Sequence, residues 1–536
     1  MKRHFLAVLL AAATFALPVL AHAQDGGMTF GTEEAEKGAP KKNPDSAAAK
    51  FLDEGKKLYG KEKFAQASLL FFKVLAQKDV SAEAYYPEAQ YQLGKALFRM
   101  GLYQGALSYF GKIVEAGDSH PYFLPTLRGL VLLTDVIPQD PLLLQRLAAY
   151  KDYFPKDVPE KYRDRFAYLV GRYLYTQLEV EPALKMLDSV TPRSPDYARA
   201  RYIAGVTHVA NYDAQPAVAA FKEVLRYLTS KQEDGYLKPA EDKLLQLTEL
   251  AMARVFYSTG QYDTSVKYYG RIPRKSSRWP TALFESSWAY FQLDLYNKAL
   301  GNLHSLNSPF FRHAYFPEGQ ILSAVIFFYN CKYDRVRYAL NEFSFEYDPL
   351  KQEIEAILEE RGEDPDAMFE WLKKQREEGV ADPYLQQVVN TALDDLQIRR
   401  KLKLIDSINA EMKKIDSMPS QWKDSDLGSS LVGDLNLALS FAQSDAGDMT
   451  AQRLQRIDRQ LEDLGLEKDK ILFEVTRGEK GQIESDLRSE MDVEADVTDA
   501  PDIDVSDEEL YWTFDGEYWR DELGYYLFNI NSECKR

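Results

Sequence analysis

Residues 94–110, GKALFRMGLYQGALSYF, decide the fold of this 536-residue chain. The small residue Gly94 is followed nine positions later by Tyr103, after three more by the small Ala106, and after four more by the large Phe110. Six further stretches have the same spacing: Gly55, Phe64, Ala67, Phe71; Gly171, Val180, Ala183, Leu187; Gly205, Ala214, Ala217, Phe221; Ala253, Tyr262, Ser265, Tyr269; Ser287, Tyr296, Ala299, Leu303; and Ala324, Tyr333, Val336, Leu340. The spacing predicts a repeated structural unit over residues 50–345.

This alternation of small and large residues is typical of two antiparallel helices that cross closely. The small residue lets the backbones approach, and the large residues fill the groove against the next pair. Most third members lie 34 to 39 residues apart, but the interval from Ala106 to Ala183 is about twice as long. We therefore expect seven to eight helix pairs, with one degenerate pair near residues 120–155 that has Gly129 at its small position.

The pattern resembles the tetratricopeptide repeat. That resemblance implies an all-α, right-handed solenoid whose concave face binds other proteins. It names neither a partner nor a pathway, because repeats of this kind serve many processes.

The first residues predict export. Lys2 and Arg3 precede an apolar run over residues 5–17, and Ala21-His22-Ala23 has the form of a cleavage site, so residues 1–23 are predicted to be a signal peptide. The run is shorter than the roughly 20 apolar residues of a membrane span. No cysteine follows the cleavage site, so a lipid anchor is not expected. A soluble periplasmic protein with a flexible linker over residues 24–49 is predicted.

The composition disfavours nucleic acid as a partner. The formal net charge is −17, and removal of Lys2 and Arg3 with the signal peptide makes it −19. Such a surface repels a phosphate backbone. The basic cluster Arg271, Arg274, Lys275, Arg278 is interpreted as a solvated loop between two helix pairs, with a local docking point for an acidic group as the alternative.

A charged helical region is expected over residues 346–480. Apolar residues at intervals of three and four, from Leu385 to Ile415 and again from Leu454 to Val475, predict two long amphipathic helices in an antiparallel hairpin or coiled coil. A shorter helix is expected over residues 429–441. Two interpretations stay open: the hairpin caps the last repeats, or it protrudes as an arm for oligomerisation.

The chain ends in two contrasting segments. Residues 481–509 are rich in acidic and poor in aromatic residues, which predicts a flexible linker. Residues 510–536 are rich in aromatic residues and are expected to dock, on this chain or on a partner, because such a patch rarely stays in solvent. The expected docking residues are Tyr511, Trp512, Phe514, Tyr518, Trp519, Tyr525 and Tyr526.

The tail carries a second resemblance. A solenoid with an export signal, an acidic linker and the ending from Gly516 to Tyr525, GEYWRDELGY, resembles periplasmic envelope proteins of the adventurous-gliding motility machinery. This resemblance implies a scaffold within an envelope-spanning complex.

The chain has two cysteines, Cys331 and Cys534. Cys331 is expected on the first helix of a repeat. In an oxidising compartment a disulfide between the two would hold the tail on the last repeat. The alternative is a buried thiol and a frayed tail cysteine.

Neither a catalytic motif nor a cofactor or metal motif is recognised in the sequence. The four histidines after the signal peptide, His120, His208, His304 and His313, lack the spacing of a metal site. The predicted function is a periplasmic scaffold or adaptor that binds envelope proteins along its concave face. A periplasmic peptide-binding chaperone or cell-wall coordinator is the alternative, and a peptidoglycan-active enzyme with a helical superhelix is a remote one.

Overall fold

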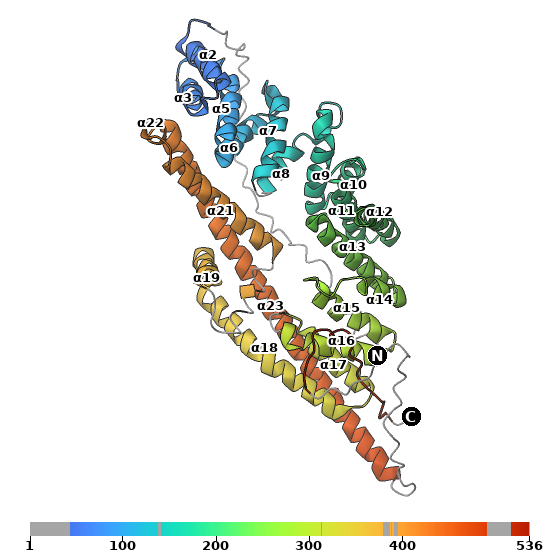
Figure 1. The fold of residues 1–536 in the computed structure, drawn as a ribbon. Helices are drawn as coiled ribbons and strands as arrows, with labels where there is room; N and C mark the ends of the chain where they lie inside the picture. Colours follow the sequence, from blue (N-terminus) through green and yellow to red (C-terminus); the bar gives the residue numbers. More distant parts are fainter. Residues whose placement is uncertain are drawn as a thin grey trace, which may run out of the picture.

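The chain folds into an arc of helix pairs that is bridged by one long helix (Figure 1). The computed structural model describes residues 43–137, 141–311, 314–378, 386, 389–390, 395–489 and 516–534. Within these ranges the secondary structure is helical and contains no strand, as the repeat pattern predicts. The predicted signal peptide and most of the two predicted linkers lie outside the described residues.

Eight helix pairs form the arc in the described residues. Their bounds are α2 (Ala47–Gly60) with α3 (Phe64–Leu75), α5 (Tyr86–Met100) with α6 (Tyr103–Glu115), α7 (Phe123–Val136) with α8 (Pro141–Ala148), α9 (Glu160–Thr176) with α10 (Val180–Asp188), α11 (Tyr197–Ala210) with α12 (Ala214–Glu233), α13 (Pro239–Ser258) with α14 (Tyr262–Tyr269), α15 (Trp279–Gln292) with α16 (Tyr296–Leu306), and α17 (Glu318–Tyr329) with α18 (Tyr333–Arg361). Short connections add α4 (Val80–Glu83) and the 3-10 turns η1 (Gly117–Ser119), η2 (Lys151–Tyr153) and η3 (Pro309–Phe311).

The small positions set the crossings within the pairs. A Cβ atom on Gly94 would lie 2.6 Å from the ring of Phe110, and one on Gly205 would lie 2.5 Å from the ring of Phe221. The small residues of the second helices are fully buried in all seven copies; they are Ala67, Ala106, Ala183, Ala217, Ser265, Ala299 and Val336. In the four copies with glycine on the first helix (Gly55, Gly94, Gly171 and Gly205), the crossing is therefore closer than a Cβ atom there would allow.

The turn inside each of these seven pairs has one left-handed residue. It lies two positions before the second helix, and its φ is between 56° and 75° in every copy. Gly101 and Gly260 occupy the position in two copies, and Glu62, Leu178, Tyr212, Asp294 and Cys331 occupy it in the others. Cys331 therefore lies in the turn after α17 and not on the first helix of the repeat, which corrects the sequence-based expectation.

The pair α7 and α8 departs from the pattern. Gly129 faces the ring of Phe110 in the preceding pair, where a Cβ atom would lie 2.7 Å from the ring, so it does not serve the crossing with α8 as expected. Within this pair the rings of Phe123 and Tyr150 stack at 4.2 Å between centroids, and the Tyr150 hydroxyl donates a hydrogen bond to the Phe123 carbonyl (2.8 Å). An aromatic contact replaces the small-to-large crossing here.

The C-terminal region is continuous with the arc, because the last helix of the arc extends into it. Helix α18 runs through residue 345, so the predicted boundary between residues 345 and 346 falls inside a continuous helix. It is followed by α19 (Pro365–Glu378), α21 (Leu396–Asp416), α22 (Ser420–Lys423) and α23 (Asp426–Ser489). The short helix expected at residues 429–441 is the beginning of the 64-residue α23, which also continues past the predicted end at residue 480.

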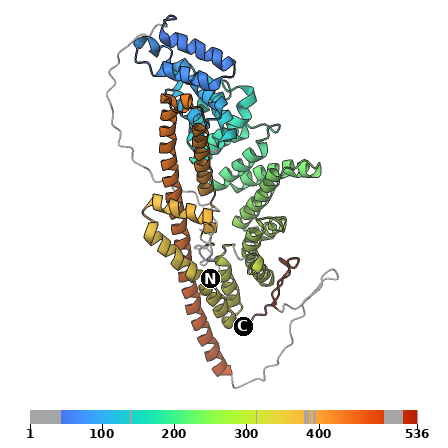
Figure 2. The same cartoon turned by 60° about the vertical axis from the view of Figure 1, so that its left-hand side comes forward.

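Helix α23 runs along the arc from the first repeats to the last (Figures 1 and 2). It packs against α21 and α19, and it contacts α6, α17 and α18 of the arc. The apolar stripe predicted from the sequence, Leu454, Ile457, Leu461, Leu464, Ile471 and Val475, is buried throughout. The hairpin of α21 and α23 is therefore neither an end cap nor a free arm, but a brace between the two ends of the solenoid.

Candidate interaction surface

The brace is attached to the first repeats by a buried tryptophan. Trp422, in α22 at the tip of the hairpin, is 2% exposed, and its indole Nε1–H donates a hydrogen bond of 3.0 Å to the hydroxyl of Ser68 on α3. These two residues are 354 positions apart in the sequence. An indole N–H that is buried needs such a partner, so the contact fixes both the position and the orientation of the tip.

A buried carboxylate makes the second attachment. Glu411 of α21 accepts hydrogen bonds from the backbone N–H groups of Gln104 (2.8 Å) and Gly105 (3.0 Å), which lie in the first turn of α6. The first amides of a helix lack intrahelical acceptors, and the helix dipole favours an anion there. Burial raises the pKa of Glu411, and the hydrogen bonds from the α6 amides oppose that shift.

The other end of the brace is attached to the last pair. The Tyr315 hydroxyl lies 3.3 Å from Oε1 of Gln460, and Nε2 of Gln460 donates to the buried carboxylate of Glu318. Nζ of Lys468 donates to the Ser344 hydroxyl (2.9 Å), and Nζ of Lys351 lies 3.4 Å from a carboxylate oxygen of Asp458. The brace is thus held by polar contacts at both ends, which maintains one curvature of the arc between them.

The described part of the tail docks on α15, α16 and α17. Leu523 is 2% exposed and is the buried anchor of the segment, although the aromatic residues attract more attention in the sequence. The N–H of Gly524 donates to the Ser305 hydroxyl (2.8 Å), and the N–H of Phe528 donates to the Asn297 carbonyl (3.1 Å). Gly301 is a close contact, because a Cβ atom there would lie 1.7 Å from the Tyr526 carbonyl oxygen.

Three of the predicted tail residues make aromatic or cationic contacts. The rings of Tyr518 and Tyr526 lie 4.8 and 4.9 Å from the imidazole of His304, and burial lowers the pKa of that histidine. The Arg274 guanidinium lies 3.6 Å from the Tyr525 ring centroid, and Nη1 of Arg274 donates to the Asp521 carbonyl (2.8 Å). Arg274 of the basic loop thus contacts the chain's own tail, which the sequence had not suggested.

Trp519 does not dock as expected. It is 59% exposed, so the indole contributes little to the attachment of the tail. Tyr511, Trp512 and Phe514 lie outside the described residues.

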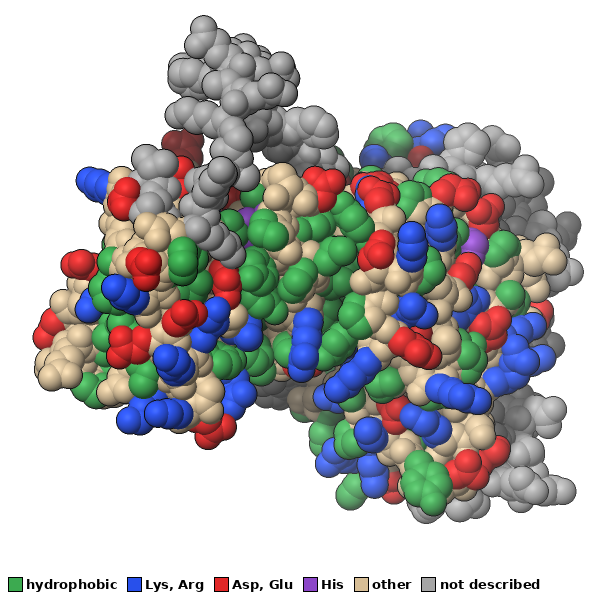
Figure 3. All heavy atoms as spheres, turned by 90° about the horizontal axis from the view of Figure 1, so that it is seen from above, with side chains coloured by type: hydrophobic (Ala, Val, Ile, Leu, Met, Phe, Trp, Pro, Cys, Tyr) green, Lys and Arg blue, Asp and Glu red, His purple; other side chains and the backbone are tan. Residues whose placement is uncertain are grey.

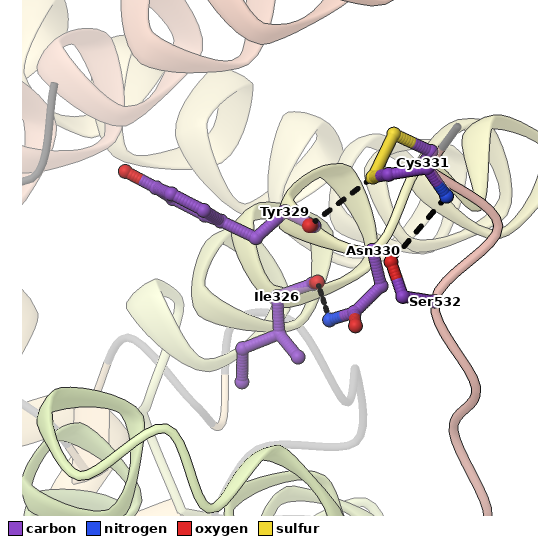
Figure 4. Close-up of a disulfide and its surroundings, with 6 residues drawn as sticks. Ile326, Tyr329, Asn330, Cys331 and Ser532 are labelled. Atoms are coloured by element: carbon purple, nitrogen blue, oxygen red, sulfur yellow. Dashed lines mark hydrogen bonds between the residues drawn. A yellow bond between two sulfur atoms is a disulfide. The ribbon is translucent and has the colours of Figure 1, made fainter. Parts of the chain in front are cut away.

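A disulfide joins Cys331 to Cys534, which are 203 residues apart (Figure 4). Nearby, the N–H of Glu533 donates to the Asn330 carbonyl (3.0 Å), and Lys332 forms an ion pair with Glu533. The Asn330 side chain in turn donates to the Ile326 carbonyl (2.9 Å). The end of the tail is therefore fixed covalently to the turn of the last helix pair.

The repeat packing residues named from the sequence lie at the crossings and turns of the pairs, and Tyr333 also lies against Gly478 of α23. Five pairs share an aromatic contact across the turn between their helices, which the sequence reading missed. Its members are Tyr59 with Phe64, Phe98 with Tyr103, Tyr257 with Tyr262, Phe291 with Tyr296, and Phe328 with Tyr333. The recurrence of aromatic residues five positions apart at these five turns was the available signal.

Charged residues of both signs share the surface. In the end-on view of Figure 3, Lys and Arg side chains are interspersed with Asp and Glu, and hydrophobic side chains gather near the centre. On the layer of first helices, ion pairs connect one repeat to the next: Lys56 with Glu88 (2.9 Å), Arg165 with Asp196 (2.9 Å), and Arg254 with Glu285 (2.6 Å). This layer is the candidate surface for binding another polypeptide.

One cleft, of about 770 Å³, lies between α18 and α19. Ile357 and Trp371 form its apolar floor, and its rim mixes acidic with basic side chains, without a histidine, serine or cysteine. The described ranges contain no group of three or more metal-ligating side chains. None of the helices in the described part of the chain combines the length and apolarity needed to cross a membrane.

Comparisons with known proteins agree with this geometry. The family model described as "Tetratricopeptide repeat" matches residues 88–116, which form most of α5 and all of α6. A search of curated proteins gives no match.

Several solved structures are similar to this chain. The apo form of RapI is 14% identical, with 69% of this chain and 99% of RapI covered at a TM-score of 0.34. A tetratricopeptide repeat protein from Parabacteroides merdae is 14% identical. The match covers 55% of this chain and 92% of that protein, and its TM-score is 0.23. Yeast Tom70 is 12% identical. The match covers 83% of this chain and 98% of Tom70, and its TM-score is 0.23.

These identities and TM-scores are too low to support an assignment of the fold. The assignment to tetratricopeptide-repeat-like helix pairs therefore depends on residues 88–116, which match the family model, and on the packing of the helix pairs. The matched pair α5 and α6 has the small-to-large crossing of Gly94 and Phe110, and six further pairs repeat its spacing, its buried small position and its left-handed turn residue. The pair α5 and α6 therefore matches the tetratricopeptide repeat, and the chain is a tetratricopeptide-repeat-like solenoid of helix pairs.

Proposed function

We propose that this protein is a scaffold or adaptor that holds segments of partner proteins along the inner face of its solenoid. The observation that carries the proposal is the brace, which attaches through Trp422 to α3 and through Gln460 and Lys468 to the last helix pair. A surface held in one shape loses less conformational entropy on binding, so it favours a defined partner. A chaperone that accommodates many unfolded clients is better served by a flexible arc.

We further propose that the protein acts in the periplasm. The predicted signal peptide supports export, and the disulfide between Cys331 and Cys534 supports an oxidising compartment, where such bonds persist. The ending from Gly516 to Tyr525 favours an envelope-spanning assembly of the gliding-motility type. The role is one of binding rather than catalysis.

Affinity purification from cells treated with a chemical crosslinker tests this proposal. We expect a small, stoichiometric set of envelope proteins to be recovered with the wild-type chain. Trp422→Ala, which releases the tip of the brace from Ser68, is expected to reduce recovery of the same set, whereas Gln421→Ala, at an exposed neighbouring residue, is expected to leave it unchanged. A broad mixture of unfolded outer-membrane proteins would support the chaperone instead and would contradict the scaffold.

A further inference from the structure

The described tail, residues 516–534, lies across the arc as a bound peptide would. The eight residues from Gly524 onward alternate between half-buried and exposed, which is the period of an extended chain. Backbone N–H groups of the tail donate to the arc, from Gly524 to the Ser305 hydroxyl (2.8 Å) and from Phe528 to the Asn297 carbonyl (3.1 Å). The tail therefore indicates which kind of segment this surface accepts.

The surface beneath the tail admits a backbone at close range. Gly301 of α16 has no room for a side chain, because a Cβ atom there would lie 1.7 Å from the Tyr526 carbonyl oxygen. Trp279 and Leu283 of α15 lie against Gly524, where a Cβ atom would come within 2.7 Å of the indole. We call this surface the cradle; it consists of Trp279, Leu283, Asn297, Gly301, Ser305 and Phe327.

The cradle is selective for a leucine that is followed by a glycine. Leu523 is the buried anchor, and Gly524 has a left-handed φ of 82° in addition to its lack of room beside Trp279. Two and four residues after this glycine, the Tyr526 ring lies 4.9 Å from the imidazole of His304, and the Phe528 ring lies 5.5 Å from the ring of Phe327 on α17. A segment with the same order of residues would make the same contacts.

Outside its covalent bond, the tail is held at the surface and not within the core. Leu523 is the one buried residue of the described tail, whereas Trp519, Tyr525 and Leu527 are 59%, 72% and 52% exposed. A segment that buries so little apolar surface gains little free energy against the entropy lost when its backbone is ordered. The disulfide at its end holds the tail beside the cradle and so raises its effective concentration there.

The disulfide lies at the periphery of the fold. Cys331 and Cys534 are both partly exposed, and the bond joins the end of the tail to the turn after α17 (Figure 4). The contacts that hold the brace, such as those of Trp422 with Ser68 and of Gln460 with Tyr315, do not involve the tail. Cleavage of the disulfide would therefore free the tail and leave the arc and its brace in place.

We propose that this disulfide is a redox-controlled latch. Its reduction by a protein dithiol releases the tail and opens the cradle to an extended segment of a partner protein, which carries a Leu-Gly pair and aromatic residues two and four positions after the glycine. The site uses the second helix α16 and not the layer of first helices, so it goes beyond the proposed scaffold function and does not depend on it.

The chemistry of the latch is thiol–disulfide exchange. One thiolate of the dithiol attacks Sγ of Cys534, a mixed disulfide forms, and the sulfur of Cys331 leaves as a thiolate that takes up a proton. The second thiolate of the dithiol then attacks its partner sulfur in the mixed disulfide, and the sulfur of Cys534 leaves and is protonated in turn. Two electrons pass to this chain, and the dithiol becomes a disulfide.

Fluorescence anisotropy with a labelled synthetic peptide tests the cradle. The probe has the sequence of residues 516–534 with Cys534→Ser, so it cannot form a disulfide. The full chain with Leu523→Asp and Cys534→Ser, the open-cradle chain, lacks the anchor and the latch of its own tail. It is expected to bind the probe and to bind a probe that also carries Leu523→Asp at least tenfold more weakly.

Two glycine substitutions in the open-cradle chain locate the binding. Gly301→Ala is expected to weaken probe binding at least tenfold, because its Cβ atom lies in the path of the peptide backbone. The control Gly465→Ala places a Cβ atom where nothing lies within 4 Å and is expected to leave binding unchanged. Circular dichroism shows whether each variant is folded. If Gly301→Ala is not, Ser305→Ala removes the acceptor of the Gly524 N–H and is expected to weaken binding about fivefold.

The latch itself is tested with the wild-type chain and the same probe. The oxidised protein is expected to bind the probe at least tenfold more weakly than protein reduced with dithiothreitol, whereas the open-cradle chain is expected to bind equally with and without this reductant. Equal binding by oxidised and reduced wild type would overturn the latch. Absence of binding by the open-cradle chain, or unchanged binding in its Gly301→Ala and Ser305→Ala variants, would overturn the cradle as a peptide site.

Discussion

At the residue scale, the fold depends on positions where a side chain has no room. Gly94 on α5 faces the ring of Phe110, and the same ring is confined on its other side by Gly129. Phe110 is 1% exposed, so it has little freedom to move away. The crossing of these helices is therefore determined by the absence of a Cβ atom at residue 94.

Gly94→Ala is expected to destabilise the protein, although alanine is the better helix former. Overpacking of a buried site costs about 1–3 kcal/mol, and the gain in helix propensity offsets about 1 kcal/mol. The thermal unfolding midpoint measured by circular dichroism should fall. The control is Gly60→Ala, because a Cβ atom at residue 60 would meet nothing within 4 Å, and its midpoint should stay the same or rise slightly. Equal effects of the two changes would refute the close crossing.

The buried carboxylate of Glu411 makes stability depend on pH. Because burial raises its pKa in the folded state above the ordinary value, the stabilising contribution is largest at low pH and is lost as pH rises from about 4.5 through the raised pKa. Glu411→Gln lacks this titration. The unfolding midpoint of Glu411→Gln relative to wild type should therefore increase between pH 4.5 and pH 7.5.

The matched control for this pH series is Glu54→Gln, which changes an exposed glutamate of α2. Its midpoint relative to wild type should stay nearly constant over the same range. A constant difference for Glu411→Gln as well would contradict the burial of this carboxylate against α6.

A contact could be predicted from the sequence when its two residues are close in the sequence and the contact recurs from repeat to repeat. The pairs Gly94 with Phe110 and Gly205 with Phe221 are 16 residues apart and recur, so the pattern exposes them. The contact of Trp422 with Ser68 spans 354 positions and occurs once, which leaves no periodic signal. The left-handed turn position was also hidden, because most copies carry a non-glycine residue there, such as Tyr212.

At the element scale, the tail is a strap that crosses α16. Gly301 lies directly beneath it, where a Cβ atom would come within 1.7 Å of the Tyr526 carbonyl oxygen. This contact is with the backbone, so a change of side-chain rotamer cannot relieve it. The tail is nevertheless fixed at its end by the disulfide and in its middle by Leu523.

Gly301→Ala is therefore expected to loosen the strap while α16 itself becomes a better helix. Hydrogen exchange followed by mass spectrometry should show at least tenfold faster exchange in the tail peptide over residues 518–534, in the oxidised protein. Gly465→Ala is the control, because a Cβ atom at that position of α23 would meet nothing within 4 Å. Unchanged exchange in Gly301→Ala would show that the tail does not lie across α16.

The helical elements were predictable and their ends less so. The apolar stripe from Leu454 to Val475 has a helical period, and its residues are buried as expected. The single helix of 64 residues was missed because residues 442–453 contain one large apolar residue, Met449, so the segment before them was interpreted as a separate short helix. Likewise, the change in composition after Phe345 was interpreted as a boundary, although α18 continues through it.

At the scale of the whole molecule, the brace distinguishes this protein from an open solenoid. An array in which each repeat contacts only its neighbours can flex along its length. Here α21, α22 and α23 join the first two pairs to the last pair, with Trp422 and Glu411 at one end and Gln460 and Lys468 at the other. The curvature of the inner face then depends on contacts outside the repeats.

The sequence predicted a hairpin but could not place it. Its two interpretations placed the hairpin on the last repeats as a cap or away from the solenoid as an arm for oligomerisation, and neither placed it on the first repeats. The contacts of Trp422 with Ser68 and of Glu411 with the first turn of α6 depend on the global curvature of the arc, which local patterns do not encode.

The distance between the hairpin tip and the first repeat is the measurement that tests the brace most directly. Spin labels on introduced cysteines at the exposed positions Gln66 of α3 and Gln421 beside Trp422 report it, with the native cysteines kept in their disulfide. Pulsed dipolar spectroscopy should give one narrow distribution at short distance, and Trp422→Ala, which costs about 3–5 kcal/mol of burial, should broaden it and shift it to longer distances. A broad, long distribution in the wild-type protein would contradict a braced solenoid.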